Sequence, residues 1–252
     1  MALDQKTDDE LKYLDLRRLR AHWDKVLGDA TKDSPSYHKF LKELIALEAA
    51  DRRERQRLSR IRRGNIADPW VLETFPFARQ PNLRKKFVTE MYDSLDYMKT
   101  PRDLVFMGPT GCGKSGLATS FLIHAMNHGY RCYFIDFKQL LLRLYQSVAD
   151  HTEKKVLKKF QTYDAIIIDE LGYAPIEKDQ AGLFFDLMKQ RHNKKTTMIT
   201  SQLGFDDWGS FLKNPHLTAA LIDRMTVNCT VFNMRKCISI REKKITYGTT
   251  DD

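Results

Sequence analysis

The stretch Gly108-Pro-Thr-Gly-Cys-Gly-Lys114-Ser115 decides the fold class of this chain. It matches the pattern G-x-x-x-x-G-K-[ST], follows the apolar run 104–107 and opens the helix-like segment SGLATSFLIHAM. A strand, a glycine-rich turn and a helix in this order make a phosphate-binding loop, because backbone N–H groups of the turn and the helix N-terminus face phosphate oxygens. The alternative is a glycine-rich turn without a ligand. The pattern predicts that the nucleotide contacts Gly108, Pro109, Thr110, Gly111, Cys112, Gly113, Lys114, Ser115 and Gly116.

Four side chains in and after this loop carry the expected chemistry. We predict that Lys114 meets the outer phosphates of ATP and that Ser115 binds Mg²⁺. The apolar run 165–168 ends in two carboxylates, Asp169 and Glu170. Asp169 is expected to hold the hydrated Mg²⁺, and Glu170 to orient and deprotonate the water that attacks the γ-phosphate. The alternative is a pair of carboxylates that only caps a strand.

Further polar residues follow another strand-like run, TMITSQL. Thr200, Ser201 and Gln202 would emerge beside the γ-phosphate from a strand next to that of Asp169. One of them could sense the phosphate or help to place the water. Polar residues at strand ends are also common without such a role.

Two arginines near the C-terminus are candidates for phosphate contact. Arg224 ends the helix-like segment LTAALIDRM. It could reach its own nucleotide, pair with Asp223, or act across a subunit interface as an arginine finger. Arg241 in CISIREKK is the second candidate, with a simple surface role as its alternative.

The order of apolar runs predicts an α/β fold. Short, nearly all-apolar runs are typical of strands that are buried on both faces, so we expect a parallel sheet sandwiched between helices. Strands are expected at 104–107, 132–135, 165–168 and 197–200. Helices are expected at about 82–98, 114–127, 137–161 with a break, and 177–192.

The first 66 residues are expected to form a small helical domain. Leucines, Trp23 and Val26 at helical spacing indicate a helix over about 9–27, ended by Gly28. Ser34 and Pro35 indicate the start of a second, long helix that Gly64 can end. The segment 67–81 holds three prolines among large apolar residues, which predicts a connector strapped onto the following domain. The domains would be 1–66 and 67–252, the second including the connector.

Composition excludes several classes of protein. The chain has 252 residues, 42% of them hydrophobic, enough for one substantial core and a small accessory domain. No apolar run approaches the roughly 20 residues of a membrane-spanning helix, and the acidic start MALDQKTDDE lacks the features of a secretory signal. Cys112, Cys132, Cys229 and Cys237 have neither a zinc-ligand nor a disulfide spacing. We therefore expect a cytoplasmic protein with reduced thiols and no membrane contact.

The net charge of +9 is accompanied by two strongly basic segments. Seven arginines and one acid lie between Arg52 and Arg63, a density that suits a polyanionic partner. In EKKVLKKF, four lysines lie on one arc of a helix and the apolar residues on the other. Such residues bind DNA phosphates without base selectivity, although a solvated helix face is the alternative. The candidate DNA contacts are Arg52, Arg53, Arg55, Arg57, Arg60, Arg62, Arg63, Lys154, Lys155, Lys158 and Lys159.

With these pieces assembled, the chain resembles the IstB family of transposition helper ATPases, related to the helicase loader DnaC and the initiator DnaA in the AAA+ class. The resemblance rests on LETFPFARQP, GPTGCGKSGLA, AIIIDELGY, TSQLGFDDW and AALIDRM in the family's order, with CISIR resembling its closing motif. It implies an AAA+ domain without a separate lid domain. It also implies that Gln202 stands at the γ-phosphate sensor, usually Asn, that Arg224 is the finger acting in trans, and that Arg241 is the second basic sensor, although Cys237 replaces a usual glycine.

The resemblance further implies partners. Members of the family assemble head to tail on nucleotide, bind duplex DNA without sequence preference and activate a transposase encoded by the same insertion element. Three alternatives remain open: a helicase loader with the same ATPase domain and another partner, a monomeric P-loop kinase with a small acceptor, and a DNA scaffold that binds nucleotide without hydrolysing it.

Overall fold

The computed structural model of this chain describes residues 2–173, 176 and 178–240. The chain forms two compact units, Met1–Ser59 and Arg60–Asp252. Helix α4 (Tyr37–Arg63) begins in the first unit and ends in the second, and the connector 67–81 belongs to the second. The functional division near residue 66 stays a prediction.

The second unit is built on a five-stranded parallel sheet. The strands follow the order β2-β3-β4-β1-β5, and each pairs in parallel with its neighbours. Their bounds are β1 (Asp103–Met107), β2 (Cys132–Asp136), β3 (Ala165–Leu171), β4 (Thr196–Ser201) and β5 (Cys229–Asn233). The four predicted strands are confirmed. The sequence did not predict β5, because this edge strand is only partly buried and includes polar residues, so it lacks a continuous apolar run.

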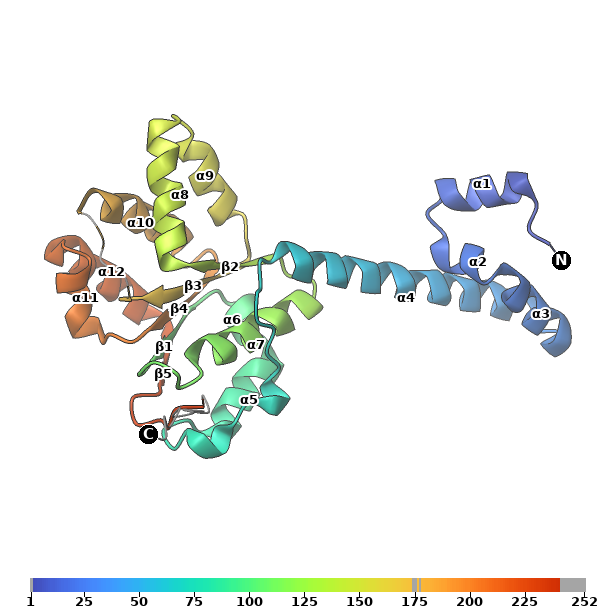
Figure 1. Ribbon diagram of the computed structural model, residues 1–252. Coiled ribbons are helices and arrows are strands. Elements are labelled where there is room, and N and C mark those ends of the chain that lie inside the picture. Colours follow the sequence, from blue (N-terminus) through green and yellow to red (C-terminus); the bar gives the residue numbers. More distant parts are fainter. Residues whose placement is uncertain (1, 174–175, 177, 241–252) are drawn as a thin grey trace, which may run out of the picture. The chain divides into compact units, whose positions relative to one another are not determined.

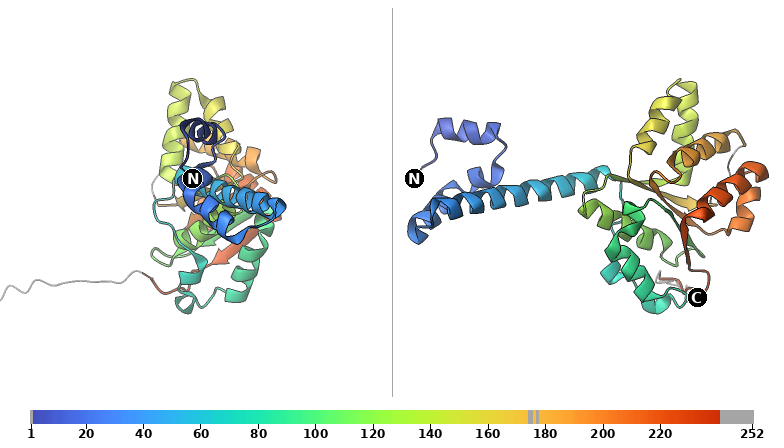
Figure 2. Two further views of the ribbon diagram at one scale, coloured as in Figure 1. Left: turned by 90° about the vertical axis from the view of Figure 1, so that its right-hand side faces the viewer. Right: turned by 180° about the vertical axis from the view of Figure 1, so that it is seen from behind.

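Helices cover both faces of this sheet, as Figure 1 and the reverse view in Figure 2 show. One core includes residues of α5 (Lys85–Ser94), α6 (Asp96–Lys99) and α7 (Lys114–Asn127). The opposite core includes residues of α8 (Phe137–Ala149), α9 (Glu153–Gln161), α10 (Lys178–Arg191), α11 (Phe205–Phe211) and α12 (Pro215–Val227). The predicted sandwich is therefore confirmed. Between β5 and Ile240, the last described residue, no helix forms.

The connector packs onto the second unit along its length. It contains two short 3₁₀ helices, η1 (Leu72–Thr74) and η2 (Phe77–Arg79). Leu72 and Phe75 are buried in the core that contains α7. The prolines prevent a long helix, while the apolar side chains between them bind the segment to the domain.

The first unit contains four helices instead of the two expected. The single helix predicted over 9–27 is wrong: the chain forms α1 (Gln5–Tyr13), α2 (Arg17–Ala21) and α3 (Trp23–Asp33). The break after α1 lies at Asp15, whose φ of 56° is left-handed and interrupts the helix. Gly28 does not end α3, which continues to Asp33 before the left-handed Ser34. The long helix predicted to end at Gly64 forms as α4. Its predicted start at Ser34 and Pro35 is wrong, because Ser34 is the C-cap of α3 and α4 begins at Tyr37, where the Ser36 hydroxyl accepts from the Lys39 N–H at 3.3 Å.

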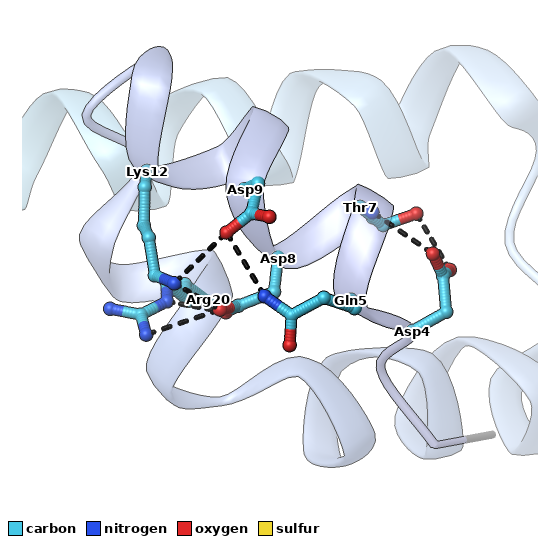
Figure 3. A network of polar contacts seen from close by, with 7 residues as sticks. All are labelled: Asp4, Gln5, Thr7, Asp8, Asp9, Lys12 and Arg20. Atoms are coloured by element: carbon cyan, nitrogen blue, oxygen red, sulfur yellow. Dashed lines mark hydrogen bonds and ion pairs between the residues drawn. The ribbon is translucent and has the colours of Figure 1, made fainter.

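Polar contacts join the helices of the first unit. Leu11 is the one buried residue among the described residues 2–59. Around it, Asp8 accepts hydrogen bonds from Arg20 and Lys12, and these lower the pKa of Asp8 to about 2 (Figure 3). Asp4 caps α1 by accepting from the Thr7 N–H at 3.0 Å. A unit with this little buried apolar area has a small hydrophobic contribution to its stability.

Among the described residues, every helix is either too short or too polar to cross a lipid bilayer. All four cysteines are free.

Candidate nucleotide-binding site

The phosphate loop joins β1 to α7, as the sequence predicted. Gly113 caps the N-terminus of α7 with a φ of 92°, a backbone conformation that favours glycine because a side chain there is strained. The Lys114 ammonium group donates to the Pro109 carbonyl at 2.8 Å, so the lysine folds over its own loop. The N-terminus of α7 and Lys114 together present positive potential on one side of the loop, which suits phosphate.

A carboxylate and two hydroxyl groups meet beside this loop. The Ser115 hydroxyl donates to Oδ1 of Asp169 at 2.8 Å. The Thr200 hydroxyl, on the neighbouring strand β4, donates to the same oxygen. Burial raises the pKa of the Asp169 carboxyl, and these two hydrogen bonds act in the opposite direction. The carboxylate and the serine hydroxyl are oxygen ligands of the kind that Mg²⁺ prefers.

A β-bulge in β3 turns Glu170 toward the cavity. Ile168 pairs with Ile199 and Leu171 with Ser201, so Asp169 and Glu170 together oppose Thr200. Glu170 has a left-handed φ of 60°, and its N–H donates to the Thr200 hydroxyl at 3.0 Å. The bulge changes the alternation of the strand, which would otherwise place adjacent side chains on opposite faces. As a result Asp169 is buried against Ser115, whereas Glu170 lines the open cavity.

The Glu170 carboxyl lies in an acidic environment. Partial burial raises its pKa, and the negative charges of Asp169 and Asp136 raise it further, as does a hydrogen bond with Asp136. Asp136 ends β2 and pairs in register with Asp169. A carboxyl group with a raised pKa is a better proton acceptor once it is ionised.

The three polar residues at the end of β4 have different positions. Thr200 and Gln202 line the cavity, and the Gln202 amide accepts from Thr110 of the loop at 3.3 Å. Ser201 is fully buried, and its hydroxyl donates to the Leu171 carbonyl at 2.7 Å. Gln202 therefore lies at the cavity and Ser201 does not, while the Thr200 hydroxyl contacts the Asp169 carboxylate and the backbone N–H of Glu170.

The cavity has a volume of about 340 Å³, within the usual range for small-molecule sites. Of the predicted loop contacts, Thr110, Gly111 and residues 113–116 line the cavity, whereas Gly108, Pro109 and Cys112 do not. The connector adds Asp68 and Trp70 to the lining. The sequence indicated the connector but not its part in this cavity. Trp70 packs so closely on the start of α7 that a Cβ at Gly116 would lie 2.8 Å from the indole ring. The connector therefore favours a glycine at this position.

Of the two arginine candidates for phosphate contact, only Arg224 belongs to the described residues. Arg224 is exposed in the last turn of α12, and it does not line the cavity. Among the described residues, no ion pair joins Arg224 to Asp223. Of the three roles open to Arg224, contact with its own nucleotide and pairing with Asp223 thus receive no support. Arg241 lies outside the described residues.

The arginines between Arg52 and Arg63 divide into two groups. Some already have protein partners: Arg55 binds Asp15 and Asp51 at 2.9 and 2.7 Å, Arg57 binds Glu54 at 2.7 Å, and Arg60 donates to the Met126 carbonyl at 2.9 Å. The four exposed ones are Arg52, Arg53, Arg62 and Arg63. This exposed group is the better candidate for DNA contact, because its side chains are accessible to a phosphate backbone.

The lysine-bearing helix α9 is amphipathic as predicted. Phe160 is buried, and Val156 and Leu157 pack against the core of the second unit. The opposite face exposes four lysines: Lys154, Lys155, Lys158 and Lys159.

The described residues contain no cluster of three or more His, Cys, Asp or Glu side chains that could hold a metal ion by themselves.

The parallel sheet, the loop after β1 and the two acids near the end of β3 define a P-loop nucleotide-binding protein of the AAA+ class. The model of the IstB-like ATP binding protein family matches residues 9–246, and the chain belongs to this family. It is 30% identical over 237 residues to the protein described as a putative ATP-binding protein of insertion sequence IS21 in Pseudomonas aeruginosa, covering 93% of this chain and 88% of that one. A counterpart from IS232 of Bacillus thuringiensis subsp. berliner is 30% identical, covering 91% and 92%.

Two solved structures share the fold. The DnaC helicase loader matches with a TM-score of 0.52 and 22% identity over 60% of this chain and 88% of that chain. AMPPCP-bound DnaA from Aquifex aeolicus matches with a TM-score of 0.56 and 14% identity over 68% and 51%. At these identities the likeness concerns the fold alone. The chain is thus an ATP-binding member of a family found in insertion sequences.

Proposed function

We propose that this protein hydrolyses ATP, assembles on duplex DNA in a nucleotide-dependent manner and recruits or activates the transposase of its insertion element. The observation that carries the proposal is the placement of Glu170 on the β3 bulge, where it lines the cavity next to the phosphate loop. A carboxylate aimed at this cavity serves a reaction with water and has no evident use in a site that only binds nucleotide.

In the proposed site, Lys114 and the N-terminus of α7 bind the β- and γ-phosphates. Ser115 and Asp169 would hold Mg²⁺, which when bound supplies charge neutralisation between the phosphates. Asp169 keeps its orientation through the Thr200 hydroxyl, and Gln202, which follows β4 and lines the cavity, would contact the γ-phosphate.

Glu170 performs the proton transfer. Its ionised carboxylate accepts a proton from a water molecule while the water oxygen forms a bond to the γ-phosphorus. The bond from this phosphorus to the bridging oxygen breaks, and ADP leaves with the electron pair. Arg224 of a neighbouring copy stabilises the negative charge that develops, because its own exposed position on α12 lies outside the cavity.

The basic surfaces supply DNA affinity. The four exposed arginines, Arg52, Arg53, Arg62 and Arg63, and the lysines of α9 offer charge to the phosphate backbone, and charge alone does not distinguish one base sequence from another. We therefore expect binding to duplexes of any sequence. The relatives from insertion sequences support a transposase as the partner, and the DnaC likeness, which concerns the fold, does not favour a helicase.

Three full-length proteins test the proposal. The wild type should release phosphate from ATP in the presence of Mg²⁺ and duplex DNA, and should form large assemblies on that DNA. Glu170→Gln should assemble as well as the wild type, but its turnover should fall by a factor of about 10² to 10⁴. Lys114→Ala should neither release phosphate nor assemble. A wild type that stays monomeric with ATP and DNA would favour a small-molecule kinase. Equal turnover by the wild type and Glu170→Gln would contradict the assigned role of Glu170.

A further inference from the structure

Three carbonyl groups of the phosphate loop accept hydrogen bonds from three different parts of the chain. When the N–H groups of a loop face a phosphate, carbonyls of the same peptides face outward and need donors of their own. The Lys114 ammonium group donates to the Pro109 carbonyl at 2.8 Å, and the Ile240 N–H donates to the Gly111 carbonyl at 2.8 Å. The third carbonyl, that of Cys112, accepts from the side-chain amide of Gln80 at 2.7 Å. Gln80 belongs to the connector and has no part in the cavity itself.

A glutamine at position 80 lowers the stability of the folded domain. Its side chain is 1% exposed, and its Oε1 is buried without a hydrogen-bond partner among the described residues. A buried acceptor without a donor destabilises a fold, so a methionine of similar length would suit an apolar core better. The benefit that offsets this cost is the contact with Cys112, in the loop that we expect to bind phosphate.

We propose that Gln80 is a positioning residue of the nucleotide site, whose amide holds the Cys112 carbonyl outward and thereby keeps the loop in its phosphate-binding conformation. The inference rests on the proposed nucleotide site and adds a residue that touches neither substrate nor metal. It also makes the connector part of the ATP-binding machinery.

A second contact of the same connector supports this role. Trp70 packs on Gly116 in the first turn of α7, while Gln80 holds the loop just before that helix. The connector therefore contacts the loop and the helix on both sides of Lys114. A shift of the connector would change the orientation of the N–H groups between these contacts, because the carbonyl and the N–H of one peptide move as a plane.

The test compares Gln80→Met with the wild type in the full chain. Removing the donor should raise the dissociation constant of a fluorescent ATP analogue, measured with Mg²⁺, about tenfold. The thermal midpoint of the nucleotide-free protein should stay within about 3 °C, because the variant also removes the buried unpaired Oε1. Thr74→Val is the matched control: it removes another connector hydrogen bond, from Thr74 to the Val71 carbonyl, and should leave both values unchanged.

Three results separate the possibilities. Unchanged nucleotide affinity in a folded Gln80→Met protein would overturn the role of Gln80. Loss of affinity and of thermal stability together would indicate a purely structural residue and would overturn it as well. A wild type that does not bind the analogue would refute the nucleotide site instead.

A measurement on the wild type keeps the proposal testable if Gln80→Met does not fold. The ¹⁵N resonance of the Gln80 side-chain amide, assigned in the wild type through its own side-chain and backbone connectivities, should shift when nucleotide is added. The Thr74→Val protein should show the same shift. An amide resonance that is indifferent to saturating nucleotide would contradict the proposal.

Discussion

The Ser115 hydroxyl donates to the Asp169 carboxylate at 2.8 Å, joining the first turn of α7 to the end of β3. Both groups would turn toward Mg²⁺ in the nucleotide complex. We expect Ser115→Ala to reduce Mg²⁺-dependent ATP turnover by at least about tenfold, because one oxygen ligand is removed. The Mg²⁺ concentration for half-maximal turnover should rise in a titration at fixed ATP. Ser120→Ala is the control, since this buried hydroxyl of α7 donates to the Leu117 carbonyl; equal Mg²⁺ requirements in all three proteins would refute the metal site.

The acidic surroundings of Glu170 predict a pH dependence. Burial, Asp169 and Asp136 raise the pKa of Glu170, and only its ionised form can accept the proton of water. Turnover should therefore fall, as the pH is lowered, at a higher pH than an ordinary glutamate would give. Asp136→Asn removes one negative charge and lowers the pKa of Glu170, so this acid limb should move to lower pH. An asparagine also retains the cap that Asp136 gives to the Gln139 N–H at 3.1 Å. A profile that does not move would show that another group controls the acid limb.

The exposed arginines predict a salt dependence of DNA binding. Replacing Arg52 and Arg53 by glutamine should weaken binding to two unrelated duplexes equally. It should also reduce the slope of log affinity against log salt by about 1.8, because each DNA phosphate that an arginine no longer neutralises reduces the slope by about 0.9. Fluorescence anisotropy over a range of salt concentrations measures this slope. Lys85→Gln with Lys86→Gln removes the same charge from α5 and should leave the slope unchanged; equal reductions in both double variants would indicate a nonspecific effect of net charge.

The hydrogen bonds of Arg191, which lies near the start of β4, predict that its substitution strongly destabilises the fold. It is fully buried and donates to the carbonyls of Phe160, Tyr163 and Thr196 at 2.7, 3.0 and 2.6 Å. Burial lowers its pKa to about 10, so the guanidinium remains charged at neutral pH. Arg191→Met should reduce the free energy of unfolding by about 3 kcal/mol or more, because these buried carbonyls lose their donor. Urea denaturation should show a lower midpoint, whereas the exposed Lys189→Met on the same α10 should match the wild type.

Local patterns predicted most of the fold and of the nucleotide site. The strands β1, β2 and β3 contain continuous apolar runs, so burial on both faces could be inferred from the residues alone. In β4 the signal is weaker, because threonines flank Met198 and Ile199. The loop 108–115 has a fixed spacing that directly reflects phosphate binding, and Asp169 and Glu170 directly follow the apolar run 165–168.

Features that depend on tertiary contacts could not be predicted in the same way. The left-handed Asp15 that divides the N-terminal helices has an ordinary helical context in the sequence. The bulge at Glu170 appears only when β3 pairs with β4. Gln80 and Trp70 reach the loop across the fold, and their spacing from it along the chain carries no signal. For the arginines, the residue types reveal the charge but not that Arg55, Arg57 and Arg60 already have partners within the chain.

The central claim is that one copy supplies Glu170 and a neighbouring copy supplies Arg224 to each reacting ATP. Mixing two inactive variants, Glu170→Gln and Arg224→Ala, tests it most directly. Each variant alone should bind ATP and DNA but turn over about 10² to 10⁴ times slower than the wild type. In an equal mixture, about a quarter of the interfaces pair an intact Glu170 with an intact Arg224, so about a quarter of wild-type turnover should return. A mixture as inactive as its components, although both variants enter the same assemblies, or an Arg224→Ala protein with full activity by itself, would contradict the account.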